Sequence, residues 1–205
     1  MEVKNNIGIN QRIPISLLGL ALNAVLKGEA SSEYFRELAS TEYQGRNRIG
    51  KAVTVFNRLT IKNPLNPFMM EHKEEFQSAL RNSRDKAMVY TAVICSAYNF
   101  GYNALAILGK LLHVQDSVTS ALLLQKLAEK YGANRSLPNA LYCILPMVEE
   151  AGIILRPKPG LIEAVRQEKY SDFALQIYKK SFLLNNPTYA ETDEVESNPY
   201  FEFIQ

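Results

Sequence analysis

The stretch of sequence that decides the fold reads SALLLQKLAEKYG at 120–132, LPNALYCILPMVEEA at 137–151 and GIILRPKPGLIEA at 152–164. In the first two runs the apolar residues recur at helical spacing, and a glycine follows each run, as it does at turns and helix C-termini. The third run holds a short β-capable segment, a Pro/Gly turn and an apolar segment that returns as a second strand or begins another helix. We therefore predict two helices joined by a glycine-containing turn, followed by a basic tip.

This order of elements is the one that a winged helix-turn-helix module requires. In such a module the first helix braces the second, and the second presents its N-terminal residues to base edges in the major groove. Asn and Arg can pair bidentately with adenine and guanine, and a basic hairpin tip can reach phosphate. The expected core-facing residues of the second helix are Leu141, Ile144, Leu145 and Val148. The predicted DNA-binding residues are Asn134, Arg135, Ser136, Asn139 and Tyr142 in that helix and its approach, and Arg156 and Lys158 in the wing.

Two patterns in this stretch resemble the winged-helix signature, LAEKYG at 127–132 and VEEAGII at 148–154. In that signature Leu-Ala-x-x-hydrophobic-Gly precedes a hydrophobic helix that is closed by Glu-Ala-Gly-hydrophobic. Pro146 departs from it, because a proline inside a helix is expected to kink it. Glu149 and Glu150 also depart, because they oppose phosphate. A helical hairpin used only for packing, or a protein-docking module, remains open as an alternative.

The rest of the chain reads as helical. Across 1–112 there is no strand-like alternation. Ser31 is placed to open the second expected helix, and Ser136 is placed to cap the helix at 137–151. The expected helices lie at 14–27, from Ser31, at 46–61, at 68–80, at 84–112, from 116 or 117 to about 131, at 137–151 and at 170–184. We predict an all-α fold with three parts: a helical bundle at 1–113, a winged helix-turn-helix-like module with its closing helix at 114–185, and an acidic tail at 186–205.

The segment between Lys86 and Lys110 contains no charged residue and is long enough to span a bilayer. It also contains Thr, Ser and Asn side chains, which are expensive in hydrocarbon without partners. We therefore expect a core helix and no membrane contact. The two cysteines, Cys95 and Cys143, fall in apolar helical runs and are expected to be buried thiols in a reducing cytoplasm.

Charge is unevenly distributed along the chain, although the formal net charge is only +2. The segment after Asn185 is acidic and contains no Lys or Arg, so all 23 Lys and Arg residues of the chain precede it. A basic body is typical of proteins that bind polyanions, although a solvated helix face looks similar. In the densest basic stretch, Ile49, Val53, Phe56 and Leu59 form the expected core stripe. The DNA-binding residues predicted there are Arg46, Arg48, Lys51 and Arg58.

The sequence offers little for catalysis. The two histidines, His72 and His113, have no ligand-spaced partner, and HKEE at 72–75 is not the HExxH pattern of a zinc protease. There is no Walker lysine loop and no GxGxxG run, and the adjacent carboxylate pairs point apart on a helix. We expect no enzymatic activity, no catalytic residues, no metal and no cofactor.

The whole layout is similar to the BrxA family of the BREX bacteriophage-defence systems. It combines the Arg-rich helix RNRIGKAVTVFNRL at 46–59, the Tyr-rich VYTAVICSAYNFGYNAL at 89–105 and a segment ending in EEAGII at 149–154. This resemblance implies a helical protein associated with DNA binding, and it carries no catalytic motif. The expected function is non-catalytic binding of double-stranded DNA in a bacterial defence or regulatory system, together with other defence-system proteins. The alternative is a protein-interaction adaptor that does not touch DNA.

Overall fold

The computed structural model describes residues 7–132, 134–166 and 169–204. Most of these residues are helical, so the protein is all-α, as the sequence predicts. The helices are α1 (Ile15–Lys27), α2 (Ser32–Ser40), α3 (Arg46–Leu59), α4 (Asn66–Glu71), α5 (Lys73–Arg81), α6 (Asp85–Ala97), α7 (Asn99–Leu112), α8 (Ser120–Tyr131), α9 (Leu137–Ala151), α10 (Asp172–Asn185) and the 3-10 helix η1 (Pro199–Ile204). The strands are β1 (Val118–Thr119), β2 (Ile154–Leu155) and β3 (Leu161–Ala164).

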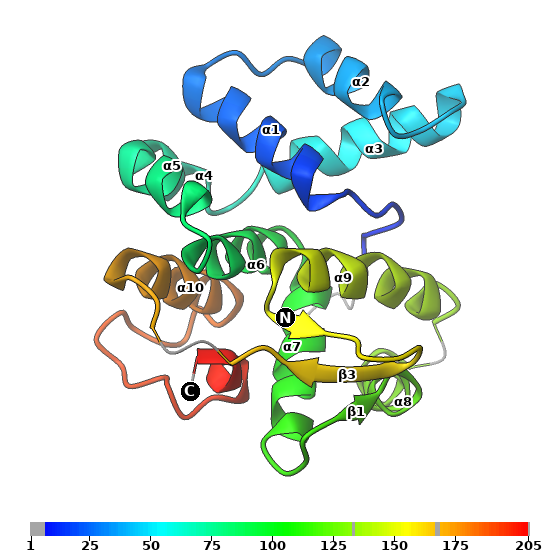
Figure 1. Ribbon diagram of the computed structural model, residues 1–205, viewed down its shortest axis with the longest axis vertical. Helices are drawn as coiled ribbons and strands as arrows, with labels where there is room; N and C mark the ends of the chain where they lie inside the picture. The colour runs from blue at the N-terminus through cyan, green and yellow to red at the C-terminus, as the bar shows by residue number, and fades with distance from the viewer. Residues whose placement is uncertain (1–6, 133, 167–168, 205) are drawn as a thin grey trace.

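Helix α6 lies at the centre of the molecule. Figure 1 shows α1, α2 and α3 together at one end, and α7, α8, η1 and the strands at the other. Between them α6 packs against α3, α5, α9 and α10. The bundle expected at 1–113 and the module expected at 114–185 therefore share one core.

The charge-free segment at 87–109 forms part of this core, as expected. Its polar side chains are satisfied internally: Thr91 Oγ1 donates to the carbonyl of Ala87 at 2.7 Å, and Asn103 Nδ2 donates to the hydroxyl of Tyr131 at 2.7 Å. Among the helices that the structure describes, none is long and apolar enough to cross a membrane.

The prediction of a single central helix is wrong, because the chain breaks at Tyr98 into α6 and α7. Tyr98 adopts an extended conformation, with φ −132° and ψ 105°. Side chains from distant helices satisfy the carbonyls that the break leaves open. Arg58 Nε donates to Ala97 O at 2.9 Å, and Asn185 Nδ2 donates to Cys95 O at 3.0 Å. Local periodicity cannot reveal such a break. The helix expected at 68–80 is likewise divided, at His72.

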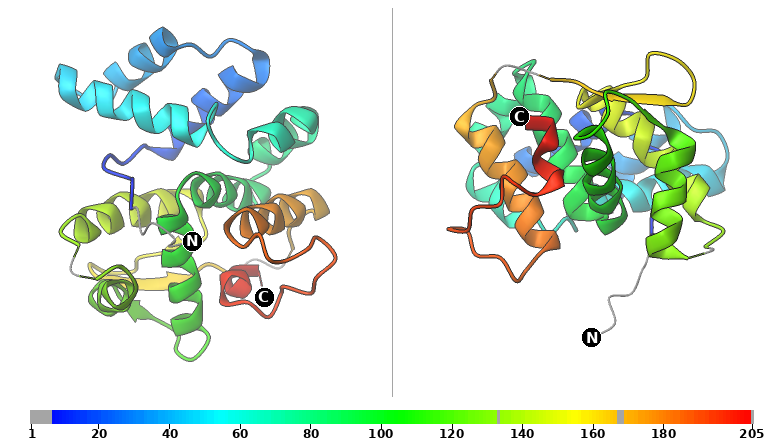
Figure 2. Two further views of the ribbon diagram at one scale, coloured as in Figure 1. Left: turned by 180° about the vertical axis from the view of Figure 1, so that it is seen from behind. Right: turned by 90° about the horizontal axis from the view of Figure 1, so that it is seen from below.

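The segment expected as an acidic tail ends in a helix that belongs to the core. Tyr200, Phe201 and Phe203 of η1 are buried against α7, beside α10 (Figure 2). The rings of Tyr178 and Tyr200 stack with centroids 4.4 Å apart. Gly109 permits the close approach, because a Cβ at this position would overlap the carbonyl of Pro199. The acidic composition of 186–205 did not predict that the aromatic residues of this segment would be buried in the core.

The three strands form a small antiparallel sheet in the order β1-β3-β2. Val118 pairs with Ile162, and Ile154 pairs with Ala164. The apolar run after the Pro/Gly turn is thus a strand, which decides between the two possibilities that the sequence left open. The chain order in this region is β1, α8, α9, β2, β3.

Candidate nucleic-acid interface

The approach to α9 and its first two turns expose the polar residues that the sequence singles out. Asn134, Arg135, Ser136 and Asn139 are all exposed, and Tyr142 is 74% exposed. The opposite side of α9 is buried against α6 and α8, as the expected core stripe requires. That side includes Leu141, Ile144, Leu145 and Val148, at most 5% exposed.

The approach to α9 is ordered by Asn134. The Ser136 N–H donates to Asn134 Oδ1 at 2.9 Å, and the Leu137 N–H donates to the Asn134 carbonyl at 3.0 Å. The expectation that the Ser136 side chain caps this helix is wrong, because its backbone is already helical and its hydroxyl makes no cap hydrogen bond. Asn134 provides the turn, since Asn side chains readily bond to backbone N–H groups two residues ahead.

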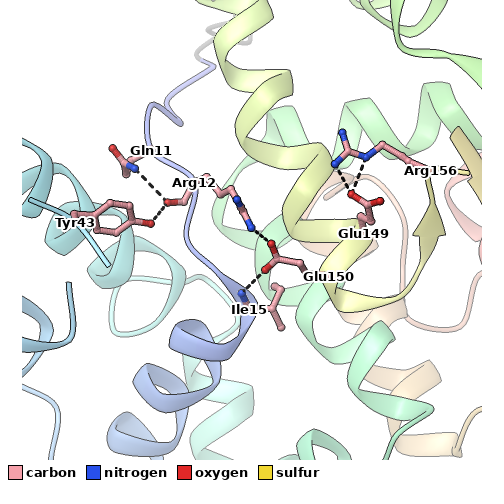
Figure 3. Close-up of polar contacts among 7 residues, drawn as sticks. All are labelled: Gln11, Arg12, Ile15, Tyr43, Glu149, Glu150 and Arg156. Atoms are coloured by element: carbon pink, nitrogen blue, oxygen red, sulfur yellow. Dashed lines mark hydrogen bonds and ion pairs between the residues drawn. The ribbon is translucent and has the colours of Figure 1, made fainter. Parts of the chain in front are cut away.

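The C-terminal end of α9 uses its two glutamates in different ways (Figure 3). Glu149 accepts a hydrogen bond from Arg156 Nε at 2.7 Å, and the pair forms an ion pair at the start of the wing. Arg156 therefore neutralises a carboxylate that would otherwise repel phosphate. Its own charge is correspondingly engaged within the protein.

Glu150 reaches the start of α1. Its Oε2 accepts from the backbone N–H of Ile15 at 2.9 Å, and its Oε1 pairs with Arg12 (Figure 3). The first N–H groups of a helix lack partners within the helix, and Pro14 at the N-cap offers no side-chain acceptor. Glu150 thus caps α1 from another helix. Sequence reasoning missed Arg12; the only local hint was a helix that begins without a capping side chain.

The turn between β2 and β3 carries Lys158, which is exposed. Neither Lys158 nor Arg135 makes an ion pair with any residue that the structure describes. Both cations are therefore available to a ligand, in contrast to Arg156.

Helix α3 presents the other predicted basic surface. Arg46, Arg48 and Lys51 are exposed. Arg58 has a structural role instead, because it donates to the end of α6 and its guanidinium lies 4.5 Å from the ring centroid of Tyr98. The core side is also rotated from the expected stripe. The fully buried residues of α3 are Ala52, Val55, Phe56 and Leu59, while Ile49 and Val53 are half-buried.

The elements that carry the predicted residues begin on one side of the molecule. Figures 1 and 2 place the beginnings of α3 and α9 and the β2–β3 turn on the same side, at the right of Figure 1. The elements that carry the exposed cations of α3 and the exposed polar residues of α9 thus begin on the same side of the molecule.

A shallow groove of about 260 Å³, here called the Tyr142 groove, runs between α8 and α9. Its lining includes Leu124, Pro138, Leu141, Tyr142, Pro146 and Arg156. A hollow of about 1000 Å³ lies elsewhere, between α7, α8 and η1, and its lining holds none of the residues predicted to bind DNA. We favour the smaller groove, because it adjoins the exposed face of α9.

The histidines lie apart from this edge. His113 Nδ1 is 3.0 Å from Glu202 Oε2, and the ring of His72 packs against Phe68 with centroids 4.5 Å apart. Within the described ranges, no three or more His, Cys, Asp or Glu side chains are placed to hold a metal ion. Comparison of the chain with protein-family models, with curated proteins and with solved structures gives no match.

Proposed function

We propose that the protein binds double-stranded DNA without catalysing a reaction, through a winged helix-turn-helix-like module at 118–164. In this proposal α9 is the recognition helix and the β2–β3 turn is the wing. The observation that carries the proposal is the exposure of Asn134, Arg135 and Asn139 in the approach and first turn of a helix whose other side is fixed in the core. These are residue types that hydrogen-bond to base edges and phosphates.

The charges around the module support this role. Glu149 and Glu150, the two acidic residues of α9, are each paired with an arginine. The exposed cations of α3, a helix that begins on the same side of the molecule as α9, add attraction that does not depend on the DNA sequence. Such contacts dominate the affinity of DNA-binding proteins and make it salt-dependent, because bound cations are released from the DNA.

A titration of a fluorescent duplex at 50 and 200 mM salt tests the proposal. We expect saturable binding that weakens steeply as salt rises, with a slope near −0.9 for each phosphate contacted. Replacing Arg46, Arg48 and Lys51 by Glu should weaken binding to all duplexes alike and flatten the slope by up to about 3 units. An adaptor that does not touch DNA would show no saturable binding at either salt concentration.

The resemblance to the BrxA family adds a setting to the proposal: a component of a bacterial phage-defence or regulatory system, acting in the cytoplasm with other defence proteins. Deleting the gene in its host and plating phages tests the setting separately. An unchanged plating efficiency would remove the defence role and leave DNA binding standing.

A further inference from the structure

The exposed face of α9 carries an apolar stripe that hydrogen bonding to base edges and contacts with phosphates do not explain. Pro138, Tyr142 and Pro146 follow each other at four-residue spacing, which places them on the same face of the helix. All three line the Tyr142 groove, and Tyr142 is 74% exposed. A proline inside a helix removes a backbone hydrogen bond and is costly, so Pro146 calls for an explanation.

We propose that the Tyr142 groove receives the 5-methyl group of a thymine in the major groove. The inference rests on the proposed function. Thymine is the base that presents an apolar group on its major-groove edge, and apolar side chains read it by contact. The prolines and the tyrosine ring offer such a surface at little entropic cost, because proline rings have no rotamer freedom to lose.

The surroundings of the groove favour DNA over an apolar peptide. Asn139 lies three residues before Tyr142 on the exposed side of α9, so the two side chains are neighbours. Asn can pair with N6 and N7 of adenine, so the two residues together suit an adenine beside a thymine. The exposed Arg135, which makes no ion pair with any residue that the structure describes, lies in the turn that leads into this helix, so the available charge next to the groove is positive.

The test replaces thymine by uracil, which pairs identically and lacks only the methyl group. A duplex is first selected from a randomised pool, and copies are then made with one thymine at a time changed to uracil. We expect uracil at one or two positions to weaken binding about fourfold, the ratio expected from losing one buried methyl-sized group. Tyr142→Ala should bind the two forms equally, whereas the control Met70→Ala, at an exposed apolar residue of α4, should discriminate as the wild type does.

The outcomes separate the two proposals. If the wild type binds every uracil copy as tightly as the parent duplex, methyl reading is wrong and DNA binding stands. Discrimination that persists in Tyr142→Ala also overturns the groove as the reader. Failure to bind any duplex overturns the proposed function and this inference together. The wild-type comparison does not depend on how any variant folds.

Discussion

The two ends of α9 differ in how they are held. At the N-terminal end, Asn134 orders the turn and the following polar side chains face solvent. At the C-terminal end, Glu150 bonds to Arg12 and to the first N–H of α1, and Gly152 closes the helix in a left-handed conformation, with φ 96°. One end is thus attached to the N-terminal helices, and the other is presented at the edge of the molecule.

This difference separates stability from binding along a single helix. Substitutions on the buried side or at the attached end should change the free energy of unfolding. Substitutions at the exposed end should change the affinity for DNA and leave the fold intact. The predictions below test this separation, beginning with the largest expected effect.

Ile144→Ala should lower the free energy of unfolding by about 2–5 kcal/mol, because Ile144 is fully buried and its loss leaves a cavity. Tyr142→Ala, two residues earlier on the exposed side, should change it by less than about 0.5 kcal/mol. Urea denaturation followed by circular dichroism measures both. Equal stability of the two variants would mean that α9 is not packed as described.

The double variant Arg135→Ala, Asn139→Ala should weaken binding to the preferred duplex by about 1–3 kcal/mol for each base-specific pair lost. Its melting temperature should stay close to that of the wild type, because both residues are exposed. Affinity is measured by fluorescence anisotropy, with an unrelated duplex as the control. Wild-type affinity for the preferred duplex in this variant would exclude α9 as the recognition helix.

Glu150→Ala should destabilise the fold by about 1–2 kcal/mol, because it leaves Arg12 without its partner and the start of α1 without its cap. The neighbouring Glu149→Ala is the matched control. It removes one partly exposed ion pair, which contributes about 0–1 kcal/mol. Chemical denaturation of the two variants should therefore rank Glu150→Ala as the less stable, and the reverse order would refute the capping role.

The smallest effect that we expect concerns the reactivity of the two cysteine thiols. Burial raises the pKa of Cys143 to about 11 and that of Cys95 to about 12, both above the ordinary value of 9.0. Both thiols should therefore stay protonated and resist a thiol reagent at pH 8, until denaturant exposes them. Because the folded state holds these protons more tightly, their contribution to stability is complete below pH 9 and falls as the pH rises towards 11 and 12. Rapid labelling of the native protein would contradict their burial.

Local patterns predicted much of the fold. Gly152 ends α9, Ser31 caps α2, and the inward residues of α9 are buried. These features depend on interactions within a few residues, which the sequence displays directly. The break at Tyr98 depends instead on partners far along the chain, which periodicity cannot display.

The candidate site, like the fold, could be predicted from the sequence only in part. The exposed residues of α9 followed from helical spacing alone. The ion pairs of Glu149 and Glu150 did not, because each depends on how the chain folds back on itself. The sequence suggested two carboxylates that repel DNA, whereas the structure pairs both with arginines. The sequence predicts only a kink at Pro146, and the place of Pro146 beside Tyr142 follows from the lining of the groove.

Mapping the DNA contact along α9 tests the central claim most directly. Amide chemical shifts of the isotope-labelled protein would be recorded while a duplex is added. We predict that the largest changes fall in 134–142 and in the β2–β3 turn, with smaller changes in the first turns of α3 and little change near Glu150. Changes confined to the hollow between α7, α8 and η1, or no changes at all, would contradict the account.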